Sequence, residues 1–244
     1  MKKIISLLLV LTLMLGLAAC GGSNNETTPS GNSPAETQDQ GGTAEQTQPQ
    51  NEDKQPSVSG EITEEILRAW PETPASDFSY ENSLNFDGIL ITAYNGSDDI
   101  VVIPAQIEGK AVVEVAGYTF ANDSMVRAVL IPDTVVELRE VFPNNELLEV
   151  VVADGVHVIR YANFLNCKNL HTLALNKDIT VIEDSAFANC ISLTEIRLPL
   201  SVENADEEEL FYAFYGCWNL TMYSEEGSIF ETVAEMLEIP FVAE

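Results

Sequence analysis

The chain has 244 residues and a formal net charge of −28, with 39 acidic residues against 11 basic ones. Such a charge repels phosphate backbones and anionic lipid, so the composition excludes nucleic acid as a partner and predicts no membrane contact through the protein surface itself. Acidity keeps a domain soluble, but it does not identify a ligand.

The first twenty residues have the order of a secretion signal. Lys2 and Lys3 precede an apolar run from Ile4 to Leu15, and small residues lead to Cys20. The run is too short for a comfortable bilayer span, and polar sequence follows at once. An ordinary signal peptide with a cysteine near the cut, or an uncleaved membrane helix, are the alternatives to the interpretation that follows.

The end of this signal, Leu17-Ala18-Ala19-Cys20, resembles the lipobox of bacterial lipoproteins. The resemblance implies that residues 1–19 are removed as a lipoprotein signal peptide and that Cys20 is lipidated. Loss of two lysines would bring the formal charge from −28 to −30. We therefore expect membrane attachment only through the N-terminal lipid, in the cell envelope and on the extracytoplasmic side.

Residues 20–60 are expected to form a lipidated cysteine and a disordered tether. Residues 21–60 contain one aliphatic residue larger than alanine, Val58, and no aromatic residue. Such a stretch cannot bury enough apolar surface to offset its ordering entropy.

Residues 61–85 are predicted to hold a short helix and a connecting segment. The sequence EITEEILRAW, residues 61–70, places Ile62, Ile66 and Trp70 on one face of a helix. The helix should end before Pro71, because a residue that precedes proline avoids the helical region.

A repeat dominates the rest of the chain, residues 86–244, and its units are marked by phenylalanine. Five of these residues follow one another at spacings of 22, 22, 23 and 27: Phe120, Phe142, Phe164, Phe187 and Phe214. Three residues after each comes Asp123, Asn145, Cys167, Cys190 or Cys217, and three further on comes Val126, Leu148, Leu170, Leu193 or Leu220. The next apolar pairs are Val129/Ile131, Val151/Ala153, Leu173/Leu175 and Ile196/Leu198.

This spacing predicts an α/β leucine-rich-repeat solenoid of about five coils. Alternating apolar residues indicate a short parallel strand in each coil, and the phenylalanine stretch should form a helical turn or 3₁₀ segment opposite it. Both ends need caps. The strand-like FDGILITAY (86–94) and a helix over 229–237, started by a capping box of Ser228 and Glu231, supply them.

The units EDSAFANCISLTEIRLPLSV and CKNLHTLALNKDITVIEDSAF resemble the BspA-like leucine-rich repeats of bacterial surface proteins. The lead-in GILITAYNGSDDIVVIPAQIEGKAVVEVAGYTF and the ending GSIFETVAEMLEIPFVAE resemble the first unit and the closing helix and strand of such arrays. The resemblance implies the solenoid fold, and it implies a link to adhesion and to contact with host cells or neighbouring bacteria.

The sequence favours no catalytic group, metal site or cofactor. Cys167, Cys190 and Cys217 share one repeat position, so they are best interpreted as a ladder of buried thiols, with a disulfide between two of them as the alternative. His157 and His171 should point outward on separate coils, away from those thiols, so no nucleophile–base pair forms. The acidic stretch at Glu203, Asp206, Glu207, Glu208 and Glu209 is best interpreted as a solvated charged loop, with calcium as the alternative ligand.

The candidate partner-binding residues lie between the core positions of each strand, where side chains face outward onto the concave surface of the solenoid. We call this set the strand face: Ile100, Val102, Ala128, Leu130, Val150, Val152, Thr172, Ala174, Glu195 and Arg197. It is apolar over its first three coils and charged at the last. A contiguous apolar patch marks an interaction surface. Equally, residues 61–85 could fold back over it, with Trp70, Phe78 and Tyr80 as the cover.

The sequence therefore predicts a non-enzymatic, lipid-anchored cell-surface protein whose strand face binds a protein or glycan partner. The alternative is a structural spacer or envelope-assembly lipoprotein with no separate ligand.

Overall fold

The computed structural model describes residues 60–122, 124–202 and 206–244. The helices are α1 (Glu64–Arg68), η1 (Ala75–Asp77, a 3₁₀ turn), α2 (Glu207–Ala213) and α3 (Ile229–Leu237). The strands are β1 (Phe78–Asn82), β2 (Ile89–Tyr94), β3 (Ile100–Val102), β4 (Gln106–Ile107), β5 (Lys110–Ala116), β6 (Ala128–Leu130), β7 (Glu137–Arg139), β8 (Val150–Ala153), β9 (Val158–Ile159), β10 (Thr172–Leu175), β11 (Val181–Ile182), β12 (Glu195–Arg197), β13 (Thr221–Ser224) and β14 (Phe241–Ala243).

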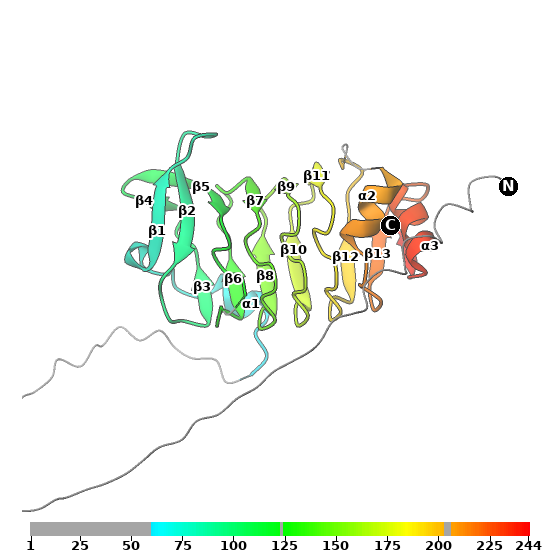
Figure 1. The fold of residues 1–244 in the computed structure, drawn as a ribbon, viewed down its shortest axis with the longest axis horizontal. Coiled ribbons are helices and arrows are strands. Elements are labelled where there is room, and N and C mark those ends of the chain that lie inside the picture. The colour runs from blue at the N-terminus through cyan, green and yellow to red at the C-terminus, as the bar shows by residue number, and fades with distance from the viewer. Residues whose placement is uncertain (1–59, 123, 203–205) are drawn as a thin grey trace, which may run out of the picture. The chain divides into compact units, whose positions relative to one another are not determined.

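Successive coils of the repeat region stack side by side, and each middle coil contributes one strand to each of two sheets (Figure 1). The first sheet has the order β1-β2-β5-β7-β9-β11, with β4 paired to β5, and the second has the order β10-β8-β6-β3. A third sheet, β12-β13-β14, closes the C-terminal end. All pairs except β1–β2 and β4–β5 are parallel, which confirms the predicted α/β leucine-rich-repeat solenoid.

The core lies between the two sheets and is built from the repeated apolar positions. The five phenylalanines are fully buried and stack coil on coil, with ring centroids 5.6, 5.1, 5.3 and 5.1 Å apart from Phe120 to Phe214. No coil could bury its own apolar face, so the stack itself creates the continuous core.

The phenylalanine stretches form tight turns. In the coil of Phe142, the Asn145 N–H donates to Phe142 O at 3.0 Å and the Leu148 N–H donates to Asn145 O at 3.4 Å. The same pair of i→i+3 bonds recurs after Phe164, Phe187 and Phe214. These are single helical turns; in the described residues, only the last of these stretches joins a true helix, α2.

An asparagine two residues after each of the first four phenylalanines shapes these turns. Asn122, Asn144, Asn166 and Asn189 have positive φ angles of 52°, 60°, 60° and 63°. Their amides also bond from coil to coil: Asn166 Nδ2 donates to Asn144 Oδ1 at 2.7 Å, and Asn189 Nδ2 donates to Asn166 Oδ1 at 2.8 Å. Asparagine tolerates the left-handed region better than other side chains, so one residue type serves both needs.

This asparagine ladder ends at Gly216, which has φ +88°. A Cβ at this position would lie 2.2 Å from Asn189 Oδ1, so the site requires glycine.

Both predicted caps are present. At the N-terminal end β1 and β2 form an antiparallel pair, so Phe78–Asn82, which the sequence placed in the connecting segment, belongs with the repeat region. At the C-terminal end α3 covers the core and β14 pairs with β13. The predicted capping box is wrong in detail: Ser228 is the N-cap without a side-chain bond, and Glu231 instead accepts from the Gly227 N–H at 2.8 Å.

The acidic stretch before Phe214 is a helix start in its described part, not a loop. Asp206 caps α2 and accepts from the Glu209 N–H at 2.9 Å, and Glu207, Glu208 and Glu209 occupy the first turn. Carboxylates at this end of a helix interact favourably with its dipole, which explains the helix where the sequence alone suggested a solvated charge run.

Several sequence predictions lie outside the described residues: the signal peptide over 1–19, Cys20, the tether up to residue 59, Asp123 and Glu203. Within the described part of the chain, no helix has the length and apolar character needed to cross a membrane.

Candidate interaction surface

The strand face divides into a covered part and an open part. Ile100, Val102, Ala128, Val150 and Val152, from β3, β6 and β8, are at most 5% exposed. Leu130, Thr172 and Ala174 are half-buried. Glu195 and Arg197 on β12 are open, with side chains 55% and 57% exposed. The face is therefore buried where it is apolar and open where it is charged.

The cover is residues 60–73, which we call the strap. Its side chains Ile62 and Leu67 are fully buried against the apolar residues of β3, β6 and β8, and Trp70 packs beside them. Figure 1 shows α1 lying against β6 and β8, and contacts between these elements confirm it. Of the two arrangements that the sequence left open, this structure adopts the one in which the chain covers its own strand face.

Two predictions about the helix and the cover are wrong in detail. The predicted helix face of Ile62, Ile66 and Trp70 is replaced by a buried set of Ile62, Leu67 and Trp70, because the helix begins only at Glu64 and Ile62 lies in the segment before it. Phe78 and Tyr80 take no part, because β1 turns them into the main core between the sheets.

Polar contacts fasten the strap at three points. The Arg68 guanidinium lies 2.6 Å from Asp154, just beyond β8, and 2.7 Å from Glu64. Thr73 pairs with the edge of β3, donating its N–H to Val102 O at 2.9 Å and accepting the Val102 N–H at 3.1 Å. Gly60 O accepts from Arg127 Nη2 at 3.4 Å. The strap thus crosses from the N-terminal rim of the strands to the C-terminal rim and returns to β3.

The docked strap leaves one buried polar group without a hydrogen-bond partner in the described residues. The Trp70 Nε1–H is buried and donates to no acceptor in the described residues. An unsatisfied buried donor of this kind costs about 1–3 kcal/mol. A helix of five residues is not stable in isolation, so α1 depends on docking for its structure.

An interruption separates the covered from the open part. Within the described residues β10 pairs only with β8, although β12 follows in the next coil, and the second sheet ends there. The core residues Leu173 and Leu175 of β10 are consequently half-buried, whereas Val151 and Ile196 at equivalent positions are at most 3% exposed. Phe164 and Phe187 still stack at 5.3 Å on the other side of the coils.

The open part is a charged sheet surface. Arg197 lies over the Tyr223 ring at 4.5 Å, and its guanidinium is 2.9 Å from Glu195 and 3.6 Å from Glu244. A hollow of about 260 Å³ beside Arg197 is also lined by Lys177. Exposed guanidinium, carboxylate and aromatic groups in one place suit polar recognition of a partner.

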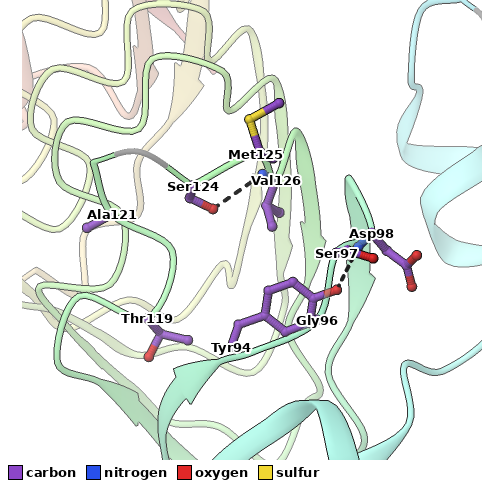
Figure 2. A pocket seen from close by; sticks show the side chains of 9 residues that line it. All are labelled: Tyr94, Gly96, Ser97, Asp98, Thr119, Ala121, Ser124, Met125 and Val126. Atoms are coloured by element: carbon purple, nitrogen blue, oxygen red, sulfur yellow. Dashed lines mark hydrogen bonds between the residues drawn. The ribbon is translucent and has the colours of Figure 1, made fainter. Parts of the chain in front are cut away.

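A second hollow lies at the N-terminal end of the phenylalanine stack and has a volume of about 440 Å³ (Figure 2). Tyr94 packs on Phe120 with ring centroids 5.7 Å apart and accepts from the Asp98 N–H at 3.1 Å. Burial raises the pKa of Tyr94 to about 12. Thr119 donates to Ala116 O at 2.6 Å and Ser124 Oγ accepts from the Val126 N–H at 3.3 Å, so these two hydroxyls already serve the turns that carry them.

The other sheet carries a ladder of ion pairs. Arg139 lies 2.8 Å from Glu114 and 3.7 Å from Glu137, and Arg160 lies 3.0 Å from Glu137 and 2.7 Å from Glu183. Each arginine bridges carboxylates on neighbouring coils, so these ion pairs tie the coils together.

The three cysteines are free and buried, as the ladder interpretation predicts. Each thiol donates to the carbonyl of the phenylalanine one coil back: Cys167 to Phe142 at 3.3 Å, Cys190 to Phe164 at 3.1 Å and Cys217 to Phe187 at 3.1 Å. Burial raises the pKa of Cys167 to about 12 and raises that of Cys190 as well. Cys167 and Cys190 therefore remain protonated and unreactive at neutral pH.

The predicted outward histidines are half-buried, and His157 Nδ1 donates to Asp178 O at 3.0 Å. In the described part of the chain, no cluster of three or more histidine, cysteine or acidic side chains is arranged to hold a metal ion.

Stacked parallel coils with a repeated outward face define the class of protein as a leucine-rich-repeat solenoid. The sequence model described as BspA type leucine rich repeat region matches residues 103–221 in six copies. The crystal structure of the T. pallidum leucine-rich repeat protein (TpLRR) is similar, with 33% identity, a TM-score of 0.58, and coverage of 63% of this chain and 71% of that one. A leucine-rich repeat protein from Bacteroides ovatus has 24% identity and a TM-score of 0.46, with coverage of 63% of this chain and 47% of that one. Comparison with curated proteins found no match.

The chain belongs to the BspA-type leucine-rich-repeat family. Its fold is that of a repeat-based scaffold for protein interaction. The lipoprotein signal and the identity of a partner stay predictions.

Proposed function

We propose that this protein is a lipid-anchored cell-surface binding or adhesion protein whose strand face contacts a protein or glycan partner. The observation that carries the proposal is the BspA-type solenoid with one repeated outward face, of which Glu195 and Arg197 on β12 remain open. In this proposal the chain has no catalytic role and no cofactor, and it meets the membrane only through the lipid on Cys20.

The open part of the strand face is the proposed first contact. Glu195, Arg197 and Tyr223 present opposite charges and an aromatic ring in one cluster. Electrostatic complementarity of this kind governs partner choice and association rate.

A binding measurement tests this site. The full chain and its Glu195→Arg/Arg197→Glu variant are used as bait on surface extracts of candidate partner cells, and recovered proteins and glycans are quantified. The double charge reversal keeps the net charge and a Glu–Arg pair but loses the contacts of Arg197 with Tyr223 and Glu244. Thermal unfolding of both baits is therefore compared, and a loss of binding at equal stability reports recognition. Equal recovery of every ligand by both baits would show that Glu195 and Arg197 on β12 are not part of the binding site.

The anchor has its own test. Mass spectrometry of the mature N-terminus should show cleavage before Cys20 and a diacylated or triacylated thioether, and Cys20→Ser should release the protein from the membrane fraction. An intact, unacylated N-terminus would refute the lipid anchor.

The second candidate is a spacer or envelope-assembly lipoprotein. The docked strap favours it, because a permanently covered apolar face needs no partner. Hydrogen exchange over residues 61–85 separates the two, since a permanent cover exchanges only when the whole domain unfolds.

A further inference from the structure

The covered part of the strand face is occupied by the strap, a segment of the same chain. We propose that the apolar face of β3, β6 and β8 is a docking groove for a short amphipathic helix, that the strap occupies it as an autoinhibitory cover, and that a basic helix from a partner protein displaces the strap. This goes beyond the proposed function, which concerns the open part of the face.

The groove has a continuous apolar floor. Ile100, Val102, Ala128, Val150 and Val152 all face outward, away from the main core, and they form a separate apolar cluster whose only other fully buried members are Ile62 and Leu67 of the strap. Five adjacent outward-facing apolar residues on parallel strands would leave a large exposed patch without the strap. The floor therefore requires an occupant, and the structure shows that a short helical turn fits it, with Leu67 as its apolar anchor and Ile62 as a second anchor just before the helix.

Charge distinguishes the strap from a better occupant. Glu61, Glu64, Glu65 and Glu72 make the strap acidic, with Arg68 as its one basic residue, and it lies on a chain of net charge −28. Among the described residues, its only ion pair to the repeat region runs from Arg68 to Asp154 at 2.6 Å. A helix with the same anchors and with lysine in place of Glu61 and Glu65 would keep that pair and add electrostatic attraction to the acidic chain.

Few buried contacts hold the strap on the strand face. Only two of its apolar side chains are fully buried, Trp70 Nε1 has no acceptor in the described residues, and Glu61, Glu65 and Arg68 are exposed. Segments with so few buried contacts open locally, without unfolding of the domain. An open population of about 1% is typical of such two-state segments.

This population sets the expected affinities. A strap that is closed about 99% of the time at an effective concentration of about 1 mM corresponds to a Kd of about 10 µM for the same segment added as a separate peptide. On the intact chain the competing strap weakens that binding about 100-fold, because only the open fraction is competent.

The experiment uses the full chain and synthetic peptides of the strap sequence, GEITEEILRAWPET, followed by fluorescence anisotropy. The strap is released in the Ile62→Asp/Leu67→Asp chain. We expect the released chain to bind the strap peptide about 100-fold more tightly than the unmodified chain does. A peptide carrying Glu61→Lys and Glu65→Lys should bind more tightly still, with an advantage that shrinks as salt is raised. A peptide with Leu67→Asp is the control and should not bind.

A second measurement on the unmodified chain covers the case in which the released chain folds poorly. The basic peptide should accelerate hydrogen exchange at the Leu67 amide, which bonds to Thr63 O at 3.0 Å, and should leave the Ile131 amide of the repeat region unchanged. Equal peptide affinity for the unmodified and released chains, or no acceleration at Leu67, would overturn the proposal. Dimers of the released chain that the peptide does not dissociate would also overturn it, because the face would then be a self-association surface. Binding of surface ligands at Glu195 and Arg197 is unaffected by either result, so failure here is distinct from failure of the proposed function.

Discussion

The asparagine ladder makes a quantitative prediction at Asn166. Its side chain accepts from Asn189 at 2.8 Å and donates to Asn144 at 2.7 Å, and its backbone has φ 60°. Asn166→Gly removes both bonds and keeps a relaxed backbone, so we expect a loss of about 1–3 kcal/mol from two bonds of about 0.5–1.5 kcal/mol each. Asn166→Ala removes the same bonds and adds about 1–2 kcal/mol for an alanine held in the left-handed region.

Urea unfolding of the unmodified protein and the two variants measures the contribution of the hydrogen bonds and the cost of the strained alanine backbone. Trp70 and Trp218 serve as fluorescent reporters near the two ends of the described chain. The alanine variant should be less stable than the glycine variant by about 1–2 kcal/mol. If the two variants unfold at the same urea concentration, backbone strain does not select asparagine. If the glycine variant matches the unmodified protein, the coil-to-coil bonds contribute nothing.

Two further predictions concern buried polar groups. Cys167 has a folded pKa of about 12, raised from 9.0, so its contribution to stability is complete below pH 9 and is lost as the pH rises toward 12. Cys167→Ser, which keeps a donor for Phe142 O, should make alkaline unfolding curves flatter; an unchanged pH dependence, or rapid thiol labelling of the native protein, would contradict the buried ladder. Arg139→Met should destabilise the domain by about 1.5–3 kcal/mol, because Glu114 is 1% exposed and would lose a charged partner. Adding Glu114→Gln should restore part of that loss in thermal unfolding, and no recovery would show that the pair is not coupled.

The repeat was predictable because its signal is local and recurs. Phe142 and Leu148, and their equivalents in the other units, stand at a fixed spacing. Stacking of the units and burial of these positions therefore follow from the period alone. The closing helix from Ile229 was predictable from a local signal as well, since Ser228 and Glu231 at its start are visible in the sequence. The asparagines two residues after each of the first four phenylalanines were equally visible, but their backbone role emerges only from the turn geometry.

The strap and the sheet interruption depend on contacts between distant residues. The helical pattern of residues 61–70 predicted one face of Ile62, Ile66 and Trp70, but in the docked segment the helix begins at Glu64 and Leu67 turns inward. Phe78 and Tyr80 could have packed on either face, and only pairing of β1 with β2 decides between them. The unpaired edge of β10 follows from how two coils meet, which no short stretch of sequence encodes.

The central claim is that the strap covers the apolar strand face and opens without unfolding of the domain. Native-state hydrogen exchange at the amides of Leu67 and Thr73, which bond to Thr63 O at 3.0 Å and Val102 O at 2.9 Å, tests it most directly. We predict protection of about 10- to 1,000-fold at both amides, well below that of Ile131, and its loss in the Ile62→Asp/Leu67→Asp chain. Unprotected strap amides would contradict the cover, and protection equal to that of Ile131 would contradict its release.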